Sequence, residues 1–258
     1  MLINTPTSFS CYFSCKLSLP TLVLLMSFSG ASVGNNLDKG IYEMNRGEFQ
    51  AAINEFRPLV SEGYAPAQYQ MALVHKNGYS VPKDAMKALA LFELAAEQNY
   101  PDAQFELALL YTEGNVVKKD LTKAFMLTDK AAQKGLASAQ FNLAVMYANG
   151  QGTKQDDFKA SRFYQLAADQ NYSLAQYNLA LLYSEGKGVE KSVEKSYIWN
   201  TIAAWNGYPN AEKSRLMDEQ QLPHKAIELS REKANTIYQK IRSQQDLKAK
   251  MIEKQSFY

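Results

Sequence analysis

Cysteine and histidine are scarce in this sequence, so it offers few thiols and imidazoles to bind a metal or to act in catalysis. Both cysteines, Cys11 and Cys15, precede the apolar run near the N-terminus. A chain cleaved after that run would contain no thiol and no disulfide. The only histidines are His75 and His224, and neither has acidic or cysteine neighbours at zinc-ligand spacing. The sequence therefore predicts no metal site and no cofactor.

The chain also lacks an excess of charge and the common catalytic motifs. Its formal net charge is +2, which gives no electrostatic reason to expect a nucleic acid as partner. No G-x-S-x-G sequence, P-loop or dinucleotide-binding fingerprint is present. No pair of carboxylates is singled out for acid–base chemistry. We therefore expect no catalytic residue and no enzymatic activity.

Helix-breaking residues are few and regularly placed. There are 8 prolines and 13 glycines, whereas alanine, leucine, glutamine, glutamate and lysine are abundant, and these residues favour helices. The composition predicts a folded, all-α protein.

Residues 1–33 differ from the rest of the chain and predict a secretory signal peptide. Lys16 is the only charged residue before Asp38, an apolar run covers residues 17–28, and small residues follow. The run is short for a membrane span of about 20 residues. We expect cleavage after Ala31 or Gly34 and a periplasmic or secreted product with no integral span. The alternative is that the run is retained as a membrane anchor.

The rest of the sequence repeats with a period of 36 residues. The pair Ala67-Gln68 recurs at 103–104, 139–140 and 175–176, and Ala95-Ala96 recurs at 131–132, 167–168 and 203–204. No insertion interrupts four successive units, which predicts one structural unit per period.

Each unit is expected to form two helices. The first helix begins near Pro66 and its equivalents. The second begins after Asp84, Asp120, Asp156 or Ser192, whose side chains can accept hydrogen bonds from first-turn amides. It ends at Asn99, Gly135, Asn171 or Gly207, residue types that tolerate the left-handed conformation of a helix stop. The glycines expected to end helices are Gly78, Gly114, Gly150, Gly186, Gly135 and Gly207.

These boundaries predict a right-handed superhelical solenoid with a C-terminal capping helix. Residues 34–63 form a shortened first unit, 64–207 form four complete units, and 208–243 form a degenerate unit followed by an amphipathic cap. Terminal repeats need a polar outer face, because a stacked array otherwise ends in exposed core. Residues 244–258 are expected to be a flexible basic tail.

The pattern A-Q-x-x-L-A-x-x-Y-x-x-G, followed by K-A and A-A, resembles the Sel-one-like repeat family, which is related to the tetratricopeptide repeats. It is most complete in residues 137–168. The resemblance implies an α solenoid and says little about function. His75 departs from it, because the other units have tyrosine there. Some exported relatives carry two cysteines per repeat and are linked to β-lactam binding; this chain lacks those cysteines.

We expect a protein partner to bind the concave face that the first helices build. Amide and acidic side chains recur there, with an apolar residue four positions later. The expected binding residues are Gln70, Val74, Glu106, Leu110, Asn142, Met146, Asn178 and Leu182. The aromatic residues Tyr69, Phe105, Phe141 and Tyr177 are interpreted as core, with a binding ribbon as the alternative.

The favoured hypothesis is thus a monomeric, non-enzymatic adaptor in the bacterial cell envelope that binds segments of other proteins. The alternative is a periplasmic hydrolase that binds peptidoglycan or β-lactams, as in the cysteine-rich branch of the family. The sequence does not identify the partner.

Overall fold

The structure is a computed structural model, and it describes residues 30–255 of the chain. All regular elements in this range are α-helices. Their order is α1 (Gly30–Asn45), α2 (Phe49–Ser61), α3 (Ala65–Asn77), α4 (Ala85–Glu97), α5 (Pro101–Glu113), α6 (Leu121–Gln133), α7 (Ala137–Asn149), α8 (Asp157–Ala168), α9 (Ser173–Glu185), α10 (Val193–Trp205), α11 (Ala211–Glu219) and α12 (His224–Gln255).

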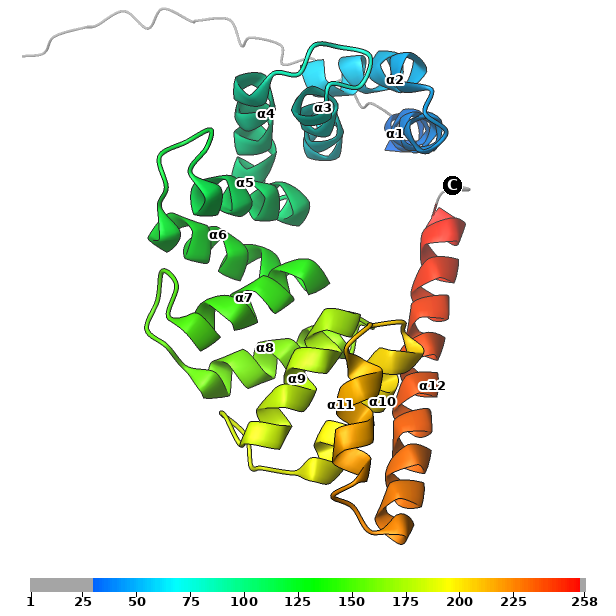
Figure 1. Cartoon of the computed structure of the whole chain (residues 1–258). Helices are drawn as coiled ribbons and strands as arrows, with labels where there is room; N and C mark the ends of the chain where they lie inside the picture. The colour runs from blue at the N-terminus through cyan, green and yellow to red at the C-terminus, as the bar shows by residue number, and fades with distance from the viewer. Residues whose placement is uncertain (1–29, 256–258) are drawn as a thin grey trace, which may run out of the picture.

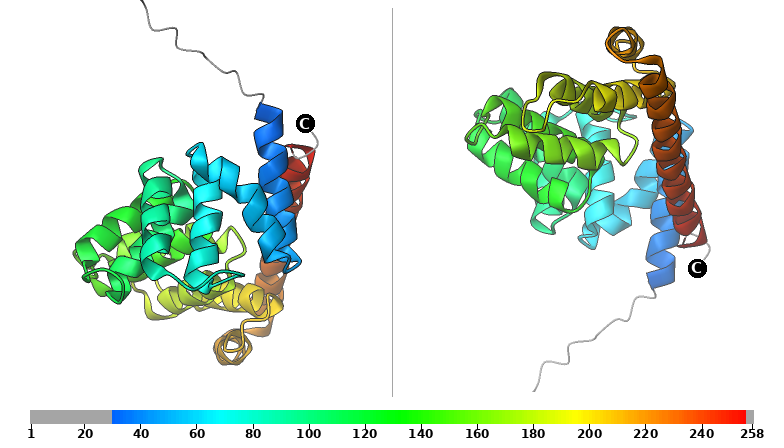
Figure 2. Two further views of the ribbon diagram at one scale, coloured as in Figure 1. Left: turned by 90° about the horizontal axis from the view of Figure 1, so that it is seen from above. Right: turned by 90° about the horizontal axis from the view of Figure 1, so that it is seen from below.

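The helices stack in pairs along an arc, and α12 spans the open side of that arc (Figure 1). Each helix packs mainly against the helices before and after it in the chain, except that α12 packs on α10. Both views in Figure 2 place α12 on the side of the molecule opposite to α5, α6 and α7. The all-α solenoid expected from the sequence is confirmed.

The first helix of each complete unit ends at a glycine in the left-handed conformation. Gly78, Gly114, Gly150 and Gly186 have φ of 79°, 77°, 67° and 75°. At Gly114 and its equivalents the amide donates to the carbonyl four residues earlier, so the left-handed residue closes the last turn. These four glycines act as the sequence predicted.

The second helices also begin and end where expected. Asp84, Asp120 and Asp156 each accept a hydrogen bond from the amide three residues later over 2.9 Å, and Ser192 accepts one over 3.2 Å. At the other end, Gly135, Gly207, Asn99 and Asn171 have positive φ. The Gly207 amide donates to the Ala204 carbonyl and the Tyr208 amide to the Ala203 carbonyl, both over 2.9 Å. These are the two bonds of a Schellman stop.

The core alternates small and large residues along the stack. The alanines of the Ala-Ala pairs, except Ala204, and those that precede the buried glutamines, such as Ala103, are buried. Large side chains such as Phe56, Phe92, Leu143 and Leu179 fill the spaces between helices. Small residues therefore let neighbouring helices approach closely, while the large ones hold the spacing.

Both ends of the solenoid differ from the expectation. Helix α1 begins at Gly30, before the predicted first unit of residues 34–63, and α12 continues to Gln255, beyond the predicted cap of residues 208–243. Residues 244–255 are therefore helical, whereas a flexible tail was expected from residue 244. The signal-peptide prediction concerns residues 1–33, which lie almost entirely outside the described range.

Candidate functional site

The four apolar residues expected to line the binding face are buried instead. Val74, Leu110, Met146 and Leu182 have exposed fractions of 0%, 9%, 5% and 9%. They point into the stack because the second helix of the same unit covers that side of the first helix. The prediction that these four side chains are available to a partner therefore needs correction.

The apolar residue one position earlier is half-buried in every unit. The four are Leu73, Leu109, Val145 and Leu181. They lie three residues after Gln70, Glu106, Asn142 and Asn178, which are also half-buried, so each pair shares one helix face. We call these eight residues the first-helix stripe. The sequence is compatible with this face too, because residues three apart share a helix face as well as residues four apart do.

Several polar groups of the stripe are already engaged. Lys76 Nζ on α3 lies 2.6 Å from Glu106 Oε2 on α5, which links two consecutive units. Asn142 and Asn178 donate their amide hydrogens to carbonyls of their own helices over 3.0 and 2.7 Å. Their Oδ1 atoms are not used in these bonds, so the stripe presents acceptors together with aliphatic side chains.

The aromatic residues next to the stripe join one unit to the next. The ring of Tyr69 lies 5.4 Å from that of Tyr100, and the ring of Phe141 lies 5.2 Å from that of Tyr172. Tyr177 and Tyr208 follow the same geometry at 4.7 Å. Burial raises the pKa of Tyr100 to about 12. These contacts support the core interpretation for Tyr69, Phe141 and Tyr177, all of which are half-buried.

His75 is the exception in a repeated lysine–tyrosine contact. In the other units the ammonium of Lys123, Lys159 or Lys195 lies 4.2, 5.2 or 5.0 Å from the ring centre of a tyrosine at the equivalent position. His75 is 8% exposed and its Nδ1 has no hydrogen-bond partner. Burial lowers its pKa, and the charge of Lys87 lowers it further. This residue is a packed substitute for tyrosine.

A cavity of about 750 Å³ lies between α8, α10 and α12. Its apolar lining includes Ile198 and Trp199 from α10 and Ile237 and Ile241 from α12. The sequence predicted the amphipathic cap helix but gave no sign of this cavity. Its lining mixes acidic and basic residues and holds no histidine or cysteine.

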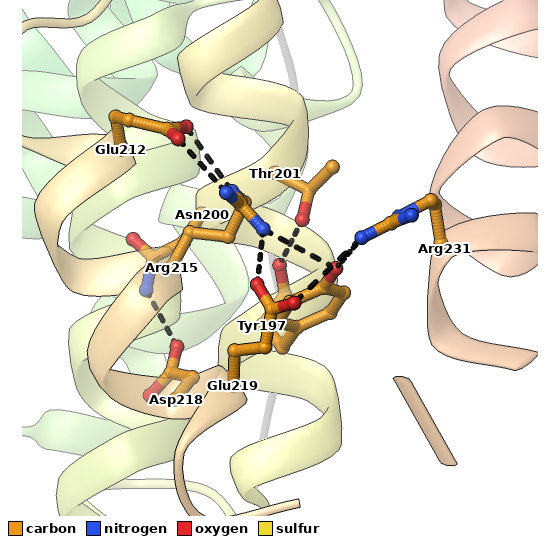
Figure 3. A network of polar contacts seen from close by, with 8 residues as sticks. All are labelled: Tyr197, Asn200, Thr201, Glu212, Arg215, Asp218, Glu219 and Arg231. Atoms are coloured by element: carbon orange, nitrogen blue, oxygen red, sulfur yellow. Dashed lines mark hydrogen bonds and ion pairs between the residues drawn. The ribbon is translucent and has the colours of Figure 1, made fainter. Parts of the chain in front are cut away.

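A polar network fastens α11 to α10 (Figure 3). The buried carboxylate of Asp218 accepts hydrogen bonds from Ser196 and Asn200, both over 2.8 Å. In the preceding units alanine occupies the position of Ser196, and Phe92, Thr128 or Tyr164 that of Asn200. Burial raises the pKa of Asp218, and the two hydrogen bonds oppose part of that rise. Ser196 and Asn200 therefore replace the residues of earlier units because they bind the Asp218 carboxylate of α11.

Arg215 extends this network toward α12. Its guanidinium makes two hydrogen bonds to Glu212, of 3.1 and 2.8 Å, and one of 2.5 Å to Glu219. The Tyr197 hydroxyl accepts from Arg215 over 3.5 Å and from Arg231 of α12 over 3.4 Å. Figure 3 shows the two guanidinium groups approaching Tyr197 from different helices. The network positions the cap and contains no nucleophile–base pair.

Among residues 30–255, no group of three or more histidine, cysteine or acidic side chains has the geometry to hold a metal ion. A Sel1 repeat model matches residues 65–100, 101–136, 137–172 and 173–208, which together make up more than half of the chain. The protein belongs to the Sel1 repeat family. The matched units have the same length as the repeats identified from the sequence and begin one residue later than the predicted range of 64–207.

Solved structures with Sel1 repeats have the same fold. A Sel1 repeat protein from Oxalobacter formigenes is 23% identical with a TM-score of 0.67, over 80% of this chain and 84% of its own. A protective antigen of uropathogenic Escherichia coli with an SLR fold is 26% identical with a TM-score of 0.50, over 75% of this chain and 48% of its own. No curated protein matches the chain.

Sel1 repeat proteins are generally scaffolds for protein interactions. Within the described residues, none of the helices has both the length and the apolar character needed to cross a bilayer.

Proposed function

We propose that the chain is a non-enzymatic adaptor of the bacterial cell envelope, which binds segments of other proteins along the first-helix stripe. The observation that carries this proposal is the recurrence of a half-buried aliphatic residue and a polar residue on four consecutive first helices. A repeated surface of this kind suits an extended or helical segment that crosses several units.

The energetics are sufficient for moderate affinity. Full burial of one aliphatic side chain contributes roughly 1.5–3 kcal/mol before ordering costs. The four aliphatic residues of the stripe are already partly covered, so each contributes less than this. Together with hydrogen bonds to free amide oxygens they support a micromolar complex, which corresponds to about 8 kcal/mol.

The stripe is tested with Leu109→Glu plus Leu181→Glu. Leu110 and Leu182 are unsuitable for this test, because a glutamate at a buried position would disturb folding. Leu109 and Leu181 are half-buried, so a charge there changes the surface. Met86→Glu plus Phe158→Glu is the matched control, because both residues are exposed on second helices. We expect the stripe variant to lose the proteins that the native chain captures from an envelope extract and the control to keep them. Equal capture by all three proteins would overturn the assignment of the stripe.

The envelope location is proposed from the signal-like segment at residues 1–33. N-terminal sequencing of the mature protein is expected to begin after Ala31 or Gly34. A mature protein that keeps its original N-terminus would overturn cleavage and favour a retained anchor.

A further inference from the structure

A second candidate surface lies on the second helices, away from the first-helix stripe. A groove of about 250 Å³ is lined by Glu93 and Glu97 of α4, Leu107 of α5, and Lys123, Leu127 and Lys130 of α6. The buried residue Gln104 also lines it, and its Oε1 has no hydrogen-bond partner. We call this the α4–α6 groove.

The same groove recurs two units later, where part of the chain occupies it. The residues 72 positions after Glu93, Glu97, Lys123 and Leu127 are Gln165, Asp169, Lys195 and Trp199. All four line the cavity between α8, α10 and α12. Helix α12 therefore covers at α10 the surface that is open at α6.

The part of α12 that lies there has a simple chemical pattern. Ile237 and Ile241 are four residues apart and pack with Ile198 and Trp199 in one apolar cluster. Lys240, directly before the second isoleucine, lines the same cavity as Asp169. Burial raises the pKa of Asp169, and the positive charge of Lys240 opposes that rise. The seated helix thus offers two aliphatic anchors and a lysine in the same cavity as an acid.

The α4–α6 groove presents the matching partners without an occupant. Leu127 stands in the place of Trp199, and Glu97 in the place of Asp169. Glu93 and Glu97 form no ion pair among the residues that the structure describes. At the equivalent positions between these two, Asp129 and Gln133 replace Glu93 and Glu97 and are hydrogen-bonded to each other on α6. An acid at the position of Asp169 is therefore present at α4–α6 and absent from the unit between.

We infer that the α4–α6 groove binds an amphipathic helix of a partner protein, with two aliphatic residues four apart and a lysine directly before the second. The lysine meets Glu97, and the aliphatic residues cover Leu107 and Leu127. The chain's own α12 does not fill this groove, since it lies on the other side of the molecule (Figures 1 and 2). This surface is distinct from the first-helix stripe.

The probe for the test is a fluorescein-labelled peptide with the sequence of residues 225–244, added to the full chain. We expect saturable binding by fluorescence anisotropy with a Kd on the order of 10–100 µM. Glu93→Lys plus Glu97→Lys is expected to weaken binding at least about tenfold, because each change replaces attraction by repulsion. Glu113→Lys plus Glu185→Lys is the matched control, and it should bind like the native chain. Both control residues are exposed at the ends of first helices.

Two results would overturn the inference. The first is equal binding by the groove variant and its control, or loss of binding with Leu109→Glu plus Leu181→Glu instead. The second is self-association of the native chain in sedimentation that Glu93→Lys plus Glu97→Lys abolishes, because this would assign the groove to a second copy. The envelope capture tests only the first-helix stripe, and the peptide titration tests only the α4–α6 groove. Either proposal can therefore fail without the other.

Discussion

Gln170 Nε2 donates a hydrogen bond to Gln140 Oε1 over 2.7 Å and another to the Gly135 carbonyl over 2.9 Å. One side chain at the end of α8 therefore ties together α6, α7 and α8. Gln98 makes the same two bonds to Gln68 and Gly63, over 2.8 and 2.9 Å. Asn206 donates to Gln176 over 2.9 Å in the last complete unit.

The second complete unit lacks this bond, which gives the first prediction. Lys134 occupies the equivalent position, and Gln104 Oε1 is buried without a partner. Lys134→Gln should supply the missing donor and raise the free energy of unfolding by about 1 kcal/mol. Urea denaturation measures the change, and Lys130→Gln on the same helix is the control. If Lys134→Gln is no more stable than that control, residue 134 does not take the place that Gln98 and Gln170 have in linking one unit to the next.

The second prediction concerns His75→Tyr. Tyrosine should restore the contact with Lys87 that the other units make, and should stabilise the fold by about 0.5–1 kcal/mol. The lowered pKa of His75 means that the unfolded chain binds a proton more readily. The native protein should therefore lose stability, relative to the variant, as the pH falls below about 6.5. Unfolding curves at pH 8 and pH 5 test this, and a constant difference between the two proteins would refute it.

The third prediction concerns the buried Asp218. Its raised pKa means that the folded chain binds a proton more tightly than the unfolded chain does. Asp218→Asn should therefore be the more stable protein at pH 7, and its advantage should shrink as the pH falls through the raised pKa. Asp218→Ala is the comparison, because it leaves Ser196 and Asn200 without their acceptor and should cost about 1–3 kcal/mol. Equal stabilities of the alanine variant and the native chain would argue against the network.

The fourth prediction concerns Gly188, which follows α9. Its φ is +66°, and a Cβ placed there would lie 2.0 Å from the backbone oxygen of Asp157. Gly188→Ala should destabilise the protein by more than the roughly 1–2 kcal/mol that a left-handed L-residue costs alone. Gly207→Ala has a similar φ and meets nothing within 4 Å, so it should show the conformational cost only. Thermal denaturation of both variants separates the two effects, and equal losses would contradict the close contact.

Much of the fold could be predicted from the sequence because its signals are local. The aspartates that begin second helices and the glycines that end helices act through their own turns, and the period places each of them. The hydrogen bonds between glutamines of one unit also have a sequence signal, since Gln68 and Gln98 recur as Gln140 and Gln170. Helical spacing does not predict them, because the bonded residues are thirty positions apart.

The orientation of the first helices could not be predicted in the same way. Leu109 and Leu110 are both compatible with an apolar helix face, and the position of α6 alone decides which of them is covered. The packing of α12 on α10 depends likewise on a contact between distant segments. The predicted apolar residues were therefore one position too far along each first helix, and binding at Gln70 and its equivalents stays a prediction.

The packing of α12 on α10 also determines the order in which parts of the molecule unfold. Each unit up to α9 is held by its sequence neighbours, so the N-terminal half can open one pair at a time from its free end. The C-terminal half is clamped, because Gln245 near the end of α12 meets Asn171 at the close of α8 over 3.1 Å. Helices α8 to α12 should thus exchange their amide hydrogens as one slow cooperative block, while α1 to α4 exchange first.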